Sequence, residues 1–120
     1  MAFERMSAED QAVIGDCLKA APVFLDSDLD TVTGVDEETF EAIAAAYPSV
    51  DDSNEDVALA IHGALLNMVF YPHSMEKKWS QFIRIPREEI PAVHARWMHL
   101  KGWDVPEADS PGELYFKLMR

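Results

Sequence analysis

Apolar residues recur every three or four positions along most of the chain, which is the spacing of amphipathic helices. A first helix is predicted to begin after Ser7, whose hydroxyl can cap it, and to stop at Pro22. A second begins after Asp36 and ends before Pro48. The third, Glu55–Tyr71, is apolar nearly all round, so we expect it to be the central buried helix.

The segment that follows fits two patterns. Residues Met75–Ile83 have the apolar spacing of a helix that begins after a Ser74 cap. Apolar and polar residues also alternate over Trp79–Ile85, which fits a short strand almost as well. We prefer the helix and keep the strand as the alternative.

The remainder of the chain predicts two more helices. One starts near Glu89, with Pro91 tolerated in its first turn, and ends at Gly102. A left-handed cap at Gly102 would let Trp103 fold back onto the helix. A short helix over Leu114–Met119 closes the chain. The whole pattern predicts an all-α fold, a compact single-domain bundle of five to six short helices that covers residues 1–120.

Composition agrees with a folded protein. Of the 120 residues, 48% are hydrophobic, enough to bury a core without cross-links. Cys17 is the only cysteine, so no internal disulfide can form, which fits a reducing compartment. The longest apolar run spans about 15 residues and is interrupted by His62, Gly63 and Asn67, short of the ~20 needed to cross a bilayer. We expect a cytoplasmic protein with no secretory signal and no membrane association.

Charge is distributed unevenly along the chain. Between Ala20 and Met75 there is no Lys or Arg, and there are eleven acids. Residues 1–56 carry a net charge of −13, whereas residues 57–120 carry +1. Like charges at this density repel one another, so we expect the acidic part to meet a basic partner. The predicted partner-binding residues are Asp26, Asp28, Asp30, Glu37, Glu38, Glu41, Tyr47, Asp51, Asp52, Glu55 and Asp56.

The leading hypothesis is therefore a non-enzymatic acidic binding or inhibitor protein that masks a basic protein. Immunity proteins, antitoxins and nucleic-acid mimics work in this way. The carboxylates would steer the partner, with Tyr47 as an anchor. Replacing Asp51 and Asp52 together with Lys is expected to slow association and to leave the fold intact. Direct nucleic-acid binding is not expected, because the acidic half repels phosphates.

Two short tracts resemble a known family. Thr33–Glu38 (TGVDEE) and Tyr47–Glu55 (YPSVDDSNE) look like segments of the bacterial immunity proteins that neutralise DNase colicins. The helical stretch that separates the two tracts in that family is missing here. In that family the Tyr-Pro turn and the acids around it contact a basic nuclease. The resemblance implies a toxin-binding role for Tyr47, Asp51, Asp52 and Glu55.

Metal chemistry is a weaker hypothesis. Asp26, Asp28, Asp30 and Glu37 occupy positions 1, 3, 5 and 12 of a calcium loop, but Thr31 stands where such loops need Gly. A solvated acidic loop is the preferred interpretation. His94 and His99 are five residues apart, too far round a helix to share a zinc ion. We therefore expect no metal and no cofactor.

Two alternative functions are kept. The first is a helical subunit of a larger assembly, anchored by an exposed Trp79 or Trp103. The second is a calcium-binding or enzymatic domain with an unrecognised site. Bases are interleaved with the tryptophans, a combination that can stack nucleic-acid bases. Trp97 lies on a core stripe, however, so we prefer a core with a basic rim. Cys17 falls on the inner face of the first helix and is expected to be buried rather than nucleophilic.

Overall fold

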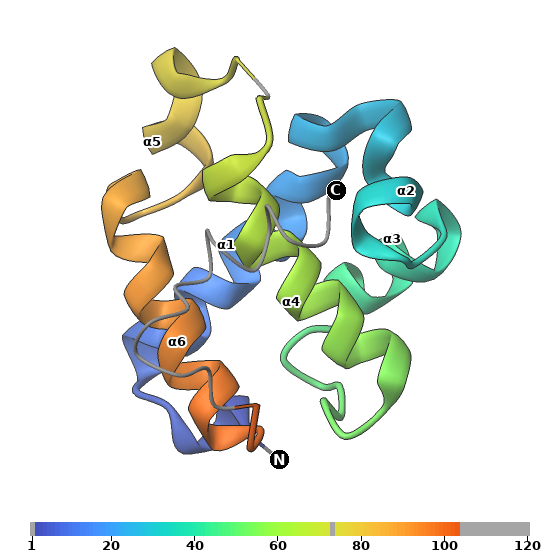
Figure 1. Ribbon diagram of the computed structural model, residues 1–120, viewed down its shortest axis with the longest axis vertical. Helices are drawn as coiled ribbons and strands as arrows, with labels where there is room; N and C mark the ends of the chain where they lie inside the picture. The colour runs from blue at the N-terminus through green and yellow to red at the C-terminus, as the bar shows by residue number, and fades with distance from the viewer. Residues whose placement is uncertain (1, 73, 104–120) are drawn as a thin grey trace.

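The computed structural model describes residues 2–72 and 74–103 (Figure 1), and this part of the chain is helical without a strand. The prediction of an all-α fold is confirmed. The helix expected over residues 114–119 lies outside the described residues. The α-helices are α1 (Ala8–Leu25), α2 (Leu29–Thr33), α3 (Glu37–Ala46), α4 (Glu55–Phe70), α5 (Trp79–Phe82) and α6 (Ile90–Leu100). Short 3₁₀ helices are η1 (Phe3–Arg5), η2 (Asp26–Asp28), η3 (Glu76–Lys78) and η4 (Arg87–Glu89).

Polar side chains cap three of the predicted helices, at Ser7 and Asp36 as expected and at Asn54 for α4. The Ser7 side chain accepts a hydrogen bond from the Asp10 amide, and the Asp36 carboxylate accepts one from the Thr39 amide. Asn54 caps α4 by accepting from the first amides of that helix. These bonds satisfy amides that have no partner inside the helix, which is why short polar residues mark each start.

Pro22 does not stop the first helix as expected. It lies inside α1, which continues to Leu25. Proline removes one backbone hydrogen bond and crowds the preceding turn, so the continuation needs compensation. The last turn of α1 supplies it, because Phe24 and Leu25 are both buried in the core. The helix ends at Asp26, which adopts a positive φ of 46°.

The predicted central helix is central in the structure. In Figure 1, α4 runs through the middle of the molecule, with α6 on one side and α2 and α3 on the other. It packs against all three and against α1, and most of its side chains are buried. A helix that is apolar nearly all round can be stable only in such a position.

Helix α2 approaches α4 closely at Gly63. A Cβ atom placed on Gly63 would lie 2.8 Å from the Cβ of Thr33 and 3.0 Å from its backbone Cα. One turn later, Asn67 Nδ2 donates hydrogen bonds to the Val32 carbonyl at 3.2 Å and to the Gly63 carbonyl at 2.8 Å. The absence of a side chain at Gly63 and the hydrogen bonds of the Asn67 side chain together hold the end of α2 against α4.

The ambiguous segment is helical, so the strand alternative for residues 79–85 is wrong. It forms η3 and α5, and Trp79 is buried with its indole N–H donating to the Ile85 carbonyl at 2.7 Å. The Phe24 and Phe82 rings pack edge to face, with centroids 5.2 Å apart. The local sequence pattern fitted a helix and a strand almost equally, and contacts with the end of α1 decided in favour of the helix.

The end of α6 matches its prediction. Pro91 lies in the first turn of the helix, and Gly102 adopts a left-handed φ of 75°. The Trp103 amide then donates to the Met98 carbonyl at 2.8 Å. The Trp103 ring packs against Trp97, with centroids 5.2 Å apart. None of the helices in the described part of the chain is both long and apolar enough to cross a membrane.

Replacing Gly63 with Ala is expected to destabilise the protein by about 1–3 kcal/mol, because the added methyl group would overlap the α2 backbone at Thr33. This loss should exceed the gain of about 1 kcal/mol in helix propensity. Urea unfolding followed by circular dichroism measures the difference. Gly15→Ala is the comparison, since its Cβ would meet only the Tyr47 ring, at 3.1 Å, and should cost less. Equal stability of Gly63→Ala and the wild type would contradict the close contact.

Candidate functional site

The predicted acidic residues are mostly exposed, and the elements that carry them lie on one side of the molecule. Helices α2 and α3 and the start of α4 lie on the side of Figure 1 opposite α5 and α6. We call the predicted partner-binding carboxylates that are exposed on this side the acidic face. They are Asp26, Asp28, Asp30, Glu37, Glu38, Glu41, Asp51, Glu55 and Asp56.

No cation of the described residues forms an ion pair with a carboxylate of the acidic face. The described residues form three ion pairs, namely Arg84–Asp16 at 2.8 Å, Arg87–Glu76 at 3.3 Å and Arg96–Asp10 at 2.8 Å. All three use acids outside the acidic face. Its negative charge therefore projects into solvent, where it can attract a cationic surface over roughly one Debye length, ~8–10 Å at physiological salt.

Asp52 does not belong to this surface, so its predicted partner-binding role is wrong. Its side chain is 1% exposed, and its carboxylate accepts hydrogen bonds from the amides of Ala2 and Phe3, each at 2.9 Å. The indole N–H of Trp97 donates to the same carboxylate at 3.1 Å. The double replacement of Asp51 and Asp52 with Lys is therefore no longer expected to leave the fold intact, because Lys at position 52 would place an ammonium group among buried donors.

Tyr47 is partly buried and already has a partner. Its hydroxyl donates to the Gln11 carbonyl at 2.6 Å, and its ring packs on Phe3 with centroids 5.1 Å apart. Burial and the nearby charge of Asp52 raise the pKa of the Tyr47 hydroxyl, so it is neutral at physiological pH. Tyr47 therefore fastens the end of α3 to α1, and only its exposed edge is available to a partner.

The calcium-type spacing does not produce a calcium-type loop. Residues 26–33 fold into η2 and α2 instead of wrapping around a central point. The Asp30 carboxylate accepts from the Thr31 amide, and the Tyr71 hydroxyl bonds to the Asp28 carboxylate. Within the described residues, no group of three or more His, Cys, Asp or Glu side chains is placed to hold a metal ion.

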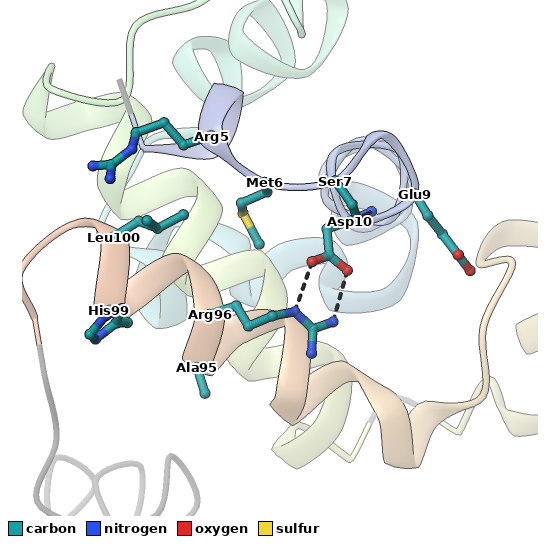
Figure 2. Close-up of a pocket in the computed structure, with 9 residues that line it drawn as sticks. All are labelled: Arg5, Met6, Ser7, Glu9, Asp10, Ala95, Arg96, His99 and Leu100. Carbon is teal, nitrogen blue, oxygen red and sulfur yellow. Dashed lines mark hydrogen bonds and ion pairs between the residues drawn. The ribbon is translucent and has the colours of Figure 1, made fainter.

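A groove of about 780 Å³ lies between the start of α1 and α6 (Figure 2), and no sequence pattern indicated it. The Arg96 guanidinium crosses it and makes two hydrogen bonds of 2.8 Å with the Asp10 carboxylate. In Figure 2, Arg5 and Glu9 extend away from this ion pair in opposite directions. The partners are 86 residues apart in the chain, so sequence spacing could not reveal the pair.

The polar groups at the centre of this groove are already paired. The hydrogen bonds from Arg96 lower the pKa of Asp10, which keeps this carboxylate ionised and unsuited to donate a proton. The remaining surface includes the side chains of Met6, Ala95 and Leu100, so the groove offers mainly apolar contact. Such a lining suits packing against an apolar group better than acid–base chemistry.

Cys17 is buried, as predicted, and burial raises the pKa of its thiol, which keeps it protonated. His62 of α4 is partly buried, and its Nδ1 lies 2.9 Å from His94 Nε2. The sequence did not indicate this partner, which lies on another helix. His94 itself is buried, whereas His99 is exposed.

The tryptophans divide between core and surface. Trp97 is fully buried and Trp79 is 8% exposed, so Trp79 cannot serve as the exposed interface anchor considered above. Trp103 is 40% exposed. Lys101 Nζ lies 5.4 Å from the Trp103 ring centroid and also donates to the Asp52 backbone carbonyl. The basic rim therefore supports the packing of α6.

Comparisons with known proteins found no match. No family model matches the chain, and neither a curated protein nor a solved structure matches it.

Replacing Asp52 with Ala is expected to lower the free energy of unfolding by about 3 kcal/mol or more. Two backbone amides and one indole N–H would be left buried without an acceptor, and each such group costs about 1–3 kcal/mol. Urea unfolding at pH 7 measures this loss. Asp56→Ala is the matched control, because Asp56 is exposed in the first turn of α4 and should change stability by less than about 1 kcal/mol. Similar losses in both variants would contradict the structural role of Asp52.

Proposed function

We propose that this protein is a non-enzymatic acidic binding protein that masks a basic surface on another protein. The partner would be a toxin, a nuclease or a nucleic-acid-binding protein, and the mode of action that of an immunity protein, antitoxin or nucleic-acid mimic. One observation carries the proposal. Nine carboxylates are exposed on one side of the fold, and no cation of the described residues forms an ion pair with them.

The physical advantage of such a surface is speed and orientation. A concentrated field of one sign attracts an oppositely charged partner and turns its basic side toward the complex. Association rates rise by orders of magnitude at low salt and fall steeply as salt is added. The same repulsion among the carboxylates that opposes folding is relieved when a basic partner docks, which favours the complex.

The carboxylates of the described residues whose pKa values are shifted have structural roles. Hydrogen bonds from Arg96 and Ser7 lower the pKa of Asp10, and hydrogen bonds with Thr39 lower that of Asp36 at the start of α3. Hydrogen bonds with Ser53 lower the pKa of Asp51. Each shift belongs to an ion pair, cap or turn, which are structural roles.

We also propose a reducing, cytoplasmic location. Cys17 is free and fully buried, where a small apolar thiol packs well. A buried free thiol is compatible with a compartment that keeps cysteines reduced.

The proposal predicts that reversing charges on the acidic face abolishes capture of the partner. Glu38→Lys with Glu41→Lys changes two exposed residues three positions apart on α3, so both changes fall on one helix face. Wild-type protein, immobilised and exposed to host lysate at low salt, should retain one basic protein that elutes at a defined step above physiological salt. The double variant should lose it, and its association rate with the purified partner should fall at least about tenfold.

The matched control is Glu88→Lys with Glu89→Lys. It makes the same net change of charge on η4, away from the acidic face, with two exposed residues. This variant should retain the partner nearly as well as the wild type. Equal losses in both variants would show that only net charge matters. Retention of many basic proteins that all leave near physiological salt would refute a specific partner.

A further inference from the structure

Two histidines from different helices meet in the interior. His62 of α4 and His94 of α6 face each other with Nδ1 and Nε2 2.9 Å apart, so in the neutral pair one imidazole donates a single N–H to the other. His94 is 1% exposed. The Trp97 ring lies nearly parallel to His94 with centroids 6.4 Å apart, and the Trp103 ring meets His62 at 5.9 Å. Two aromatic rings therefore flank the pair.

Positive charge on this pair would have no compensating carboxylate among the described residues. Burial lowers the pKa of His62, and burial together with His62 lowers that of His94, to about 3; no acid contributes to either. The charged groups on the elements packed around the pair are engaged elsewhere or exposed. Three ion pairs engage Arg96 with Asp10, Arg84 with Asp16 and Arg87 with Glu76. The Asp52 carboxylate accepts from Trp97, and its backbone carbonyl accepts from Lys101. The other charged side chains on these elements are exposed, namely Glu4, Arg5, Glu9, Lys19, Glu55, Asp56, Glu88, Glu89 and His99.

The direction of the resulting pH dependence follows from proton binding. In an opened or unfolded chain a histidine has an ordinary pKa near 6.5, whereas His94 in the folded protein has a pKa of about 3. Between these values the opened chain binds more protons, so acid favours opening. The stability contributed by neutral His94 is complete above pH 6.5 and is lost progressively as the pH falls toward 3.

We propose that the His62–His94 pair, covered by Trp103, is an acid-operated latch between α4 and α6. A first proton leaves a charge in an apolar site, and a second sets two N–H groups against each other across the 2.9 Å contact. Both are relieved when Trp103 moves away and water reaches the rings. Trp103 follows the left-handed Gly102 and is 40% exposed, which makes it the most exposed ring of this cluster. Acid thereby exposes an aromatic surface formed by Trp97 and Trp103.

The test compares the full chain at pH 8 and at lower pH by tryptophan fluorescence and by hydrogen exchange of the α6 amides. For the wild type, emission should shift to longer wavelength below pH 6. The opening constant of α6, after correction for intrinsic exchange, should rise about thirtyfold by pH 5, the value for a histidine that titrates near 6.5 only when opened. His94→Gln keeps a side-chain donor but cannot titrate, so both changes should be clearly smaller than in the wild type, with only the contribution of His62 left. His99→Gln, an exposed histidine on the same helix, should behave as the wild type.

Two results would overturn the proposal: a wild-type spectrum and α6 exchange that stay constant between pH 8 and 4.5, or a His94→Gln variant that changes as the wild type does. If His94→Gln is unfolded at pH 8 by circular dichroism, His62→Asn replaces it, since an amide nitrogen can take the place of Nδ1. If neither variant folds, imidazole resonances of the wild type decide. Ordinary titration of both rings near pH 6.5 with unchanged α6 exchange overturns the latch, and titration coupled to faster exchange supports it.

Discussion

The buried carboxylate of Asp52 is the constraint on which one end of the molecule depends. It accepts hydrogen bonds from the amides of Ala2 and Phe3 and from the indole N–H of Trp97. Asp52 lies in the segment that leads into α4, so these bonds join that segment to the start of the chain and to α6. A buried carboxylate is stable only when its oxygens are fully hydrogen-bonded. The packing of Phe3 on Tyr47 and the groove between η1, α1 and α6 lie around this junction.

The polar residues that interrupt the apolar run of α4 correspond to its most specific contacts. His62 bonds to α6, Gly63 admits the backbone of α2, and Asn67 donates to the end of α2. The other, apolar side chains of α4 do not by themselves fix the orientation of the neighbouring helices, because hydrophobic burial is not directional. These three residues therefore specify how neighbouring helices are placed around a helix that would otherwise tolerate several arrangements.

Charge is separated in space as well as along the chain. Arginines of the second half pair with Asp10 and Asp16 of α1 and with Glu76 of η3, which binds the basic elements to one side of the fold. The acids of residues 26–56 have no such partner among the described residues. Exposed ion pairs of this kind stabilise a fold only modestly, so the core must hold the acidic face together against its own repulsion. That repulsion is the physical basis for proposing a basic partner.

Local patterns determined much of the fold. The caps at Ser7 and Asp36 and the turn from Gly102 to Trp103 follow from interactions within about one helical turn, which neighbouring residues specify. The apolar residues on every side of α4 predict its central position. Tertiary structure decided the rest. Burial of Phe24 and Leu25 carries α1 past Pro22, and contacts with α1 make residues 79–82 helical. Asp51 and Asp52 are equivalent in sequence, yet only Asp52 is buried, and His62 meets a histidine 32 residues away. Such pairings depend on how helices pack, and helix packing joins residues whose separation along the chain carries no periodic signal.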